Sequence, residues 1–170
     1  MRFKQYLNEK TFSISADVDM IYKKYFLKYL KPFHKMKNND LTDFQNKIWC
    51  ASKKGKWDFG TTTSEIFKSR TAKKAHELNP VTLMFGAVSD GSFYSYKEKV
   101  ISVSLNSDII DLLVSGRSMD NIKNLMITDR DRFERFKNEL SEESVKATIY
   151  HELSHWINDS MKVLFLMSLY

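Results

Sequence analysis

The sequence has little of what marks several large classes of protein. Its 170 residues include a single cysteine, Cys50, which excludes an internal disulfide framework and fits a reducing, cytoplasmic compartment. Only five glycines and two prolines occur, so no low-complexity linker divides the chain. The longest apolar run, residues 163–170, is too short to cross a bilayer, and residues 1–10 are too polar for a signal peptide. These absences predict one domain over residues 1–170 without a membrane span.

The composition and the charge distribution indicate a folded protein with a basic N-terminal part. Hydrophobic residues make up 42% of the chain and aromatic residues 14%, which is enough for a core and argues against disorder. Residues 1–60 carry 13 Lys and Arg against 6 Asp and Glu, whereas residues 100–170 carry 8 against 11. The basic part could meet an acidic protein partner. Its aromatics follow helical spacing and no nucleic-acid motif accompanies them, so nucleic-acid binding is not expected.

The hydrophobic spacing predicts an α+β fold. Residues 1–80 read as basic and mainly helical, with helices at about 15–31, 41–51 and 64–78. Strands are expected within about 81–105, and helices over 107–158. In residues 100–105, Ile101, Val103 and Leu105 share one face of a strand, while Ser102 and Ser104 share the other. We therefore expect a small antiparallel sheet packed against helices.

One pentapeptide indicates a chemistry. His151-Glu152-Leu153-Ser154-His155 is an HExxH sequence. Two histidines four residues apart on a helix differ by about 40° around the axis and about 6 Å along it, so both can reach one metal ion. Glu152 projects about 100° from His151, where it can hold a water molecule. Zn²⁺ polarises a carbonyl and lowers the pKa of water, and a glutamate then transfers the proton.

The flanking residues favour a metal site over a chance match. An HExxH sequence arises by accident in on the order of one chain of this length in two hundred. No charged side chain other than Glu152 occurs over residues 147–158, which predicts a helix buried on most of its surface. Ser141 can cap this helix, with Glu142 and Glu143 in its first turn. Two histidines on a buried helix are hard to satisfy without a metal.

Residues 148–157, TIYHELSHWI, resemble the extended signature of the zincin metallopeptidases. The resemblance implies an active-site helix behind a small antiparallel sheet whose edge strand aligns a peptide substrate. It also implies that His151 and His155 bind Zn²⁺ and that Glu152 is the general base of a peptidase or amide hydrolase. The strand at residues 100–105, polar on one side, is the candidate for the aligning edge.

The third zinc ligand of a zincin has no obvious counterpart. In the longer pattern HExxHxxGxxH, Asn158 replaces the glycine and Met161 replaces the last histidine, and a thioether does not suit Zn²⁺. Asp159 is the only carboxylate downstream, and it could serve as a ligand only if the helix breaks near Asn158. The upstream candidates are Cys50, His76 and His34.

An alternative function follows from the missing ligand. A zincin-like fold with an incomplete metal site would be a structural or binding protein, using its basic N-terminal part on an acidic partner. Residues 1–9 resemble the opening of some tailed-phage proteins, which implies virion assembly and the host cytoplasm or the virion as locations. The sequence leaves the hydrolase and the binding protein both open.

Overall fold

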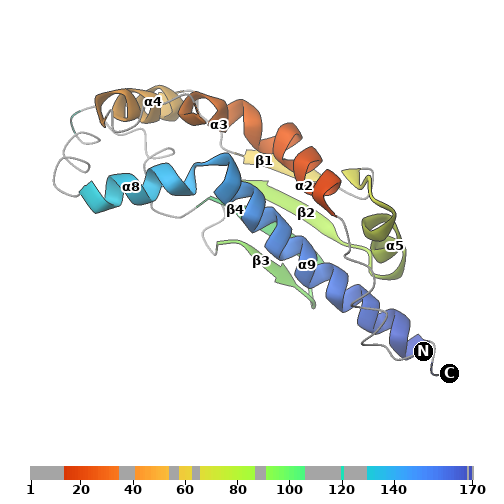
Figure 1. The fold of residues 1–170 in the computed structure, drawn as a ribbon. Coiled ribbons are helices and arrows are strands. Elements are labelled where there is room, and N and C mark those ends of the chain that lie inside the picture. Colours follow the sequence, from red (N-terminus) through yellow and green to blue (C-terminus); the bar gives the residue numbers. More distant parts are fainter. Residues whose placement is uncertain are drawn as a thin grey trace.

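The computed structural model describes residues 14–34, 41–53, 58–62, 66–86, 91–105, 120, 130–167 and 169. These residues form an α+β arrangement (Figure 1). In chain order the elements are α2 (Ser15–Ile21), the π-helix η1 (Tyr22–Phe26), α3 (Leu27–His34), α4 (Leu41–Lys53), β1 (Asp58–Thr62), α5 (Arg70–Leu78), β2 (Thr82–Gly86), β3 (Phe93–Ser95), β4 (Val100–Ser104), α8 (Arg130–Glu139) and α9 (Glu142–Met167). Among the helices described, none combines the length and apolar character that a membrane span needs.

The sheet is mixed, so the expectation of an antiparallel sheet is wrong in part. Its order is β1-β2-β4-β3. The β1–β2 and β3–β4 pairs are antiparallel, but β2 and β4 run parallel. After β2 the chain passes to the outer edge as β3 and returns beside β2 as β4. Strand patterning predicts which residues share a face and leaves the pairing partner undetermined, which is why the parallel pair was missed.

The predicted aligning edge is also wrong, because β4 lies inside the sheet and β3 forms the edge. Ser102 on β4 is fully buried. The hydroxyl of Ser92 donates to the carbonyl of Ser104 at 3.1 Å and accepts from its N–H at 2.9 Å. The hydroxyl of Ser102 also bonds the carbonyl of Gly91 at 3.5 Å, so the segment that leads into β3 packs against this part of β4.

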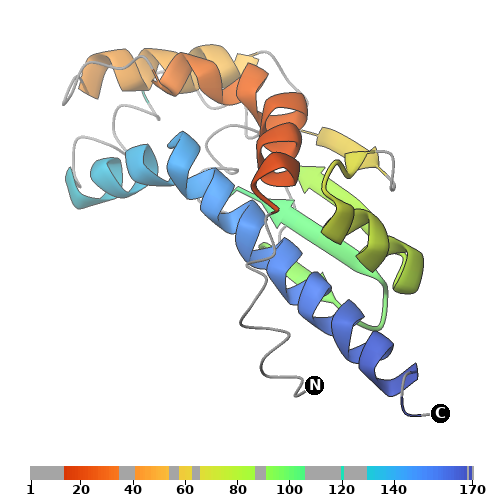
Figure 2. The same cartoon turned by 45° about the vertical axis from the view of Figure 1, so that its right-hand side comes forward.

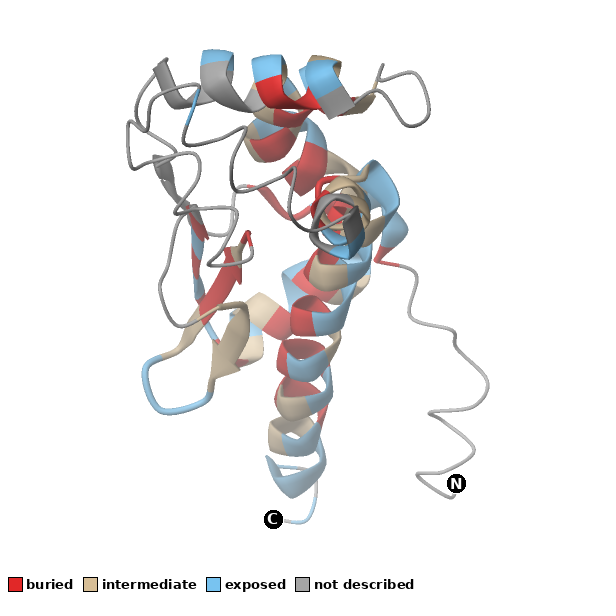
Figure 3. Ribbon diagram, turned by 90° about the vertical axis from the view of Figure 1, so that its left-hand side faces the viewer, coloured by how far each residue is buried: buried red, intermediate tan, exposed pale blue. Residues whose placement is uncertain are grey.

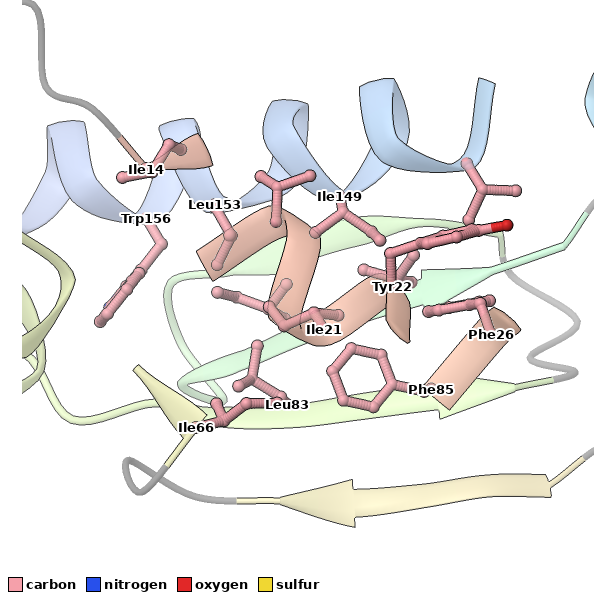
Figure 4. Close-up of a cluster of buried hydrophobic side chains, with 14 of the residues drawn as sticks. Ile14, Ile21, Tyr22, Phe26, Ile66, Leu83, Phe85, Ile149, Leu153 and Trp156 are labelled. Atoms are coloured by element: carbon pink, nitrogen blue, oxygen red, sulfur yellow. The ribbon is translucent and has the colours of Figure 1, made fainter. Parts of the chain in front are cut away.

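One face of the sheet is covered by a layer of helices. Helix α9 lies beside α2 and η1 and packs on β4 and β3 (Figure 2). Between these layers, Leu83 and Phe85 of β2 lie in one buried cluster with Ile21 of α2 and Phe26 of η1 (Figure 4). Leu153 of α9 belongs to the same cluster. Every one of these five side chains is at most 3% exposed. This core positions α9 against the sheet.

The first helical region runs further than expected. Helix α2 continues through η1 into α3, which ends at His34 with Pro32 inside it. Helix α5 begins later than residue 64, at Arg70, where the hydroxyl of Ser69 accepts the N–H of Ala72. The predicted helices between residues 106 and 129 lie outside the described residues, apart from residue 120.

Asp17 joins the first helix to the segment that leads into α5. Its side chain is fully buried, and Oδ1 accepts the backbone N–H of Lys68 at 2.6 Å and of Ser69 at 3.0 Å. Helix α5 then packs on α9. Its C-cap residue, Asn79, is 3% exposed, and the carbonyl of Asn79 accepts the indole N–H of Trp156 on α9.

The motif helix begins where the sequence predicts and ends later. The hydroxyl of Ser141 accepts the N–H of Ser144 at 3.2 Å, and Glu142 and Glu143 occupy the first turn of α9. The helix continues for 26 residues without a break at Asn158. Buried and exposed residues alternate around it (Figure 3), so only one side is buried and the other, with Tyr150, His151 and His155, is open.

Candidate metal centre

The two motif histidines lie together on the open side of α9. Their Nε2 atoms are 3.0 Å apart, and their ring centroids are 4.5 Å apart with the rings nearly perpendicular. At this distance one Nε2 carries a proton and the other accepts it, which requires different tautomers of the two imidazoles. Both lone pairs could instead point to a single cation. The HExxH spacing therefore brings the two nitrogen atoms to one point, as predicted.

Glu152 lies on a different side of the helix and is 6% exposed. Burial raises the pKa of its carboxyl above the ordinary value, because the charged form loses solvation. His151, His155 and a hydrogen bond from the backbone N–H of Tyr94 oppose that shift. The carboxylate is thus held between the histidine pair and the edge strand, with its orientation fixed by a main-chain donor.

A cleft of about 670 Å³ opens at this place between β3 and the C-terminal half of α9. The two elements lie side by side (Figure 1). The cleft is lined by Ser92, Phe93, Tyr94, His151, Glu152, His155, Asn158, Asp159, Met161 and Lys162. All three residues of the motif that carry acid, base or ligand chemistry face one cavity.

A directed chain of hydrogen bonds fixes one wall of the cleft. The indole N–H of Trp156 donates to the carbonyl of Asn79 at 2.9 Å, and the amide of Asn79 donates to the hydroxyl of Tyr94 at 3.1 Å. Tyr94 in turn donates to Oδ2 of Asp159 at 3.3 Å. Burial raises the pKa of Tyr94, and Asp159 adds to the shift, so the hydroxyl keeps its proton. Tyr94 thereby bridges two turns of α9, since its N–H bonds Glu152 and its hydroxyl bonds Asp159.

Asp159 is not brought to the histidine pair as a third ligand. Because α9 continues past Asn158, Asp159 stays a helical turn beyond His155. Its carboxylate is bonded to Tyr94 and, at 3.5 Å, to the ammonium of Lys162. Within the described part of the chain, no group of three His, Cys, Asp or Glu residues is assembled for a metal. The prediction of Asp159 as a ligand depended on a helix break that does not occur.

The upstream candidates have other surroundings. His76 accepts the N–H of Val81 at 3.2 Å through Nδ1 and packs between Phe67 and Trp156, where burial lowers its pKa. His34 bonds the hydroxyl of Tyr22 at 3.0 Å. Cys50 is exposed on α4. None of these three belongs to the described lining of the cleft.

Sequence reasoning missed Tyr94 and Asn79. Tyr94 is one of several aromatic residues in a β-rich stretch, and nothing in its neighbours marks it. Asn79-Pro80 signals a helix end, which is correct, but gives no hint that the amide of Asn79 bonds the hydroxyl of Tyr94. Comparison with protein-family models, curated proteins and solved structures finds no match to this chain, so the argument for the site rests on its geometry.

Proposed function

We propose that the cleft is a zinc-dependent hydrolytic centre for peptide or other amide bonds, with His151 and His155 as metal ligands. The observation that carries the proposal is the 3.0 Å separation of the two Nε2 atoms. Two nitrogen ligands of a tetrahedral Zn²⁺ lie about 3.3 Å apart, given Zn–N distances near 2.0 to 2.1 Å. Both imidazoles are exposed to the cleft and serve no purpose in the core. When bound, zinc would act as a Lewis acid on a carbonyl and lower the pKa of water.

Glu152 suits the role of general base. Its ionised carboxylate can accept a proton from a water molecule in the cleft and return it to the departing amine. The carboxylate lines the same cleft as the two histidines, and the N–H of Tyr94 holds one of its oxygens in place.

The edge strand β3 suits the binding of an extended substrate. Within the described sheet, β3 pairs on one side only, and that open edge borders the cleft. Residues from His151 to Lys162 would span about 16 Å of helix, which matches about five residues of extended peptide. Within the described residues, no third His, Cys, Asp or Glu joins the histidine pair in a metal-binding group.

Hydrolysis of a fluorogenic casein by zinc-loaded protein tests this function. We expect Glu152→Gln to keep its zinc and to lose activity by about 10²- to 10⁴-fold, because it cannot take up the proton. Glu143→Gln on the same helix is the matched control, since Glu143 is exposed and outside the cleft, and it should stay fully active. Equal activity of Glu152→Gln and the unmutated protein would remove Glu152 from the mechanism.

A second candidate is a zincin-like binding protein without a complete metal site, placed in a virion or on an acidic partner. It is favoured by the exposed lysines of η1 and α3 (Lys23, Lys24, Lys28 and Lys31), for which the described residues supply no ion pair. Lys24 and Lys28 lie over the rings of Tyr25 and Tyr29. A protein free of zinc that binds polyglutamate, and loses that binding when these lysines become glutamine, would support this candidate.

A further inference from the structure

The position of Asp159 gives the cleft a charged end. Asp159 follows His155 by four residues, as His155 follows His151, so all three lie on one face of α9. Each step advances about 6 Å along the helix and turns about 40°. The carboxylate of Asp159 therefore lines the cleft about one helical turn beyond the histidine pair.

The hydrogen bonds orient this carboxylate as an acceptor. The amide nitrogen of Asn79 can only donate, so the oxygen of Tyr94 accepts from it and the Tyr94 hydroxyl must donate elsewhere. It donates to Oδ2 of Asp159, and a carboxylate has about four acceptor positions in total. Asn79 is buried and also bonded to Trp156, so the hydroxyl of Tyr94 is held in place to bond Asp159, whose other acceptor positions remain open.

The present cationic neighbour of Asp159 is easily displaced. The side chain of Lys162 is 71% exposed while that of Asp159 is 22% exposed, and their atoms are 3.5 Å apart. Ion pairs of such exposed lysines contribute little, because solvent screens them and the long side chain loses entropy. A substrate cation could replace Lys162 and make shorter, charge-assisted hydrogen bonds.

We propose that Asp159 is a specificity-determining residue that binds a Lys or Arg side chain of the substrate. This inference rests on the proposed function, and it names the substrate class of that cleft. An extended peptide advances about 3.3 Å per residue. A basic side chain within two residues of the bond to be cleaved would thus reach Asp159. That substrate residue would lie beside the C-terminal end of α9.

Binding to the zinc-treated Glu152→Gln protein tests the proposal without turnover. The probes are three sets of fluorescein-labelled hexapeptides in which a single Lys, Gln or Glu is moved through an alanine background, and the readout is fluorescence anisotropy. We expect the best Lys peptide to bind about tenfold more tightly than its Gln counterpart, as one charge-assisted hydrogen bond allows. The Glu peptide should bind more weakly than both.

Two further substitutions in the same background decide the role of Asp159. Asp159→Asn keeps an acceptor for Tyr94 and should abolish the preference for Lys, whereas Lys162→Gln removes the competing ammonium and should strengthen it. Glu143→Gln removes one negative charge, as Asp159→Asn does, and should leave the preference for Lys unaltered. Absence of measurable binding of the Lys peptides, no preference between Lys and Gln, or a preference that survives Asp159→Asn would overturn the proposal. Absence of zinc or of casein hydrolysis would instead defeat the proposed function, since the peptide preference is read from binding alone.

Discussion

The two sides of helix α9 differ in what holds their side chains. On the core side, Ile149, Leu153, Trp156 and Ile157 are at most 2% exposed, and the indole N–H of Trp156 is bonded to Asn79. On the cleft side, His151 and His155 are exposed and are bonded only to each other among the described contacts. The first side explains why the helix lies where it does. The cleft side contributes little to folding, so packing does not explain why His151, Glu152 and His155 lie together there.

The core side of α9 is expected to determine the stability of the protein, and the cleft side its function. Deleting buried side chains leaves cavities that the surrounding structure cannot close, which makes the core side sensitive to substitution. Exposed positions away from such features usually change stability by less than about 0.5 kcal/mol. Variants on the two sides should therefore fail in different assays.

The largest effect on stability is expected from Trp156→Ala. The ring stacks on Phe67 at 4.9 Å and is fully buried, so its loss should lower the free energy of unfolding by about 3 to 5 kcal/mol in urea. Trp156→Phe, which keeps a ring but not the N–H, should lose less. In the metal-free protein, His155→Ala should change the free energy of unfolding by less than about 0.5 kcal/mol. A small loss in Trp156→Ala would mean that this side does not hold the helix.

An intermediate effect is expected where the two sides meet. Tyr94→Phe removes the hydroxyl that joins Asn79 to Asp159, leaving a buried amide without its acceptor. We expect a loss of about 1 to 2 kcal/mol in the free energy of unfolding and an unchanged zinc content. Tyr96→Phe is the control, because Tyr96 is 60% exposed in the neighbouring turn. Loss of zinc from Tyr94→Phe would show that the wall and the histidine pair are not independent.

The smallest effect concerns Glu152 in the metal-free protein. Its pKa is raised above the ordinary value of 4.5, so the folded protein binds this proton more tightly than the unfolded chain. The ionised carboxylate then costs stability above the raised pKa, and the cost vanishes as the pH falls below 4.5. Glu152→Gln should therefore have the higher Tm at pH 8, with the difference closing towards pH 4. A lower Tm than the unmutated protein at pH 8 would contradict this, and exposed Glu143→Gln should show no such trend.

The sequence predicts α9 well because its signals are local. Ser141, Glu142 and Glu143 mark its start, and the spacing of His151 and His155 sets their approach whatever surrounds them. The parallel pairing of β2 and β4 depends on contacts distant in sequence, so strand patterning could not predict it. The same holds for the wall built by Asn79 and Tyr94, which lie 77 and 65 residues from their partners in α9. The end of the helix was missed because Asn158 tolerates both a helix and a break.

The most direct test of the metal centre is the zinc content of the protein after equilibrium dialysis, measured by mass spectrometry. We expect the unmutated chain to retain about one Zn²⁺ per molecule at neutral pH, and His151→Ala and His155→Ala to retain almost none. In the presence of EDTA, all three proteins should unfold at the same urea concentration, so that the loss of zinc is not a loss of folding. An unmutated protein without stoichiometric zinc, or alanine variants that keep it, would contradict the assignment of His151 and His155 as the metal-binding pair.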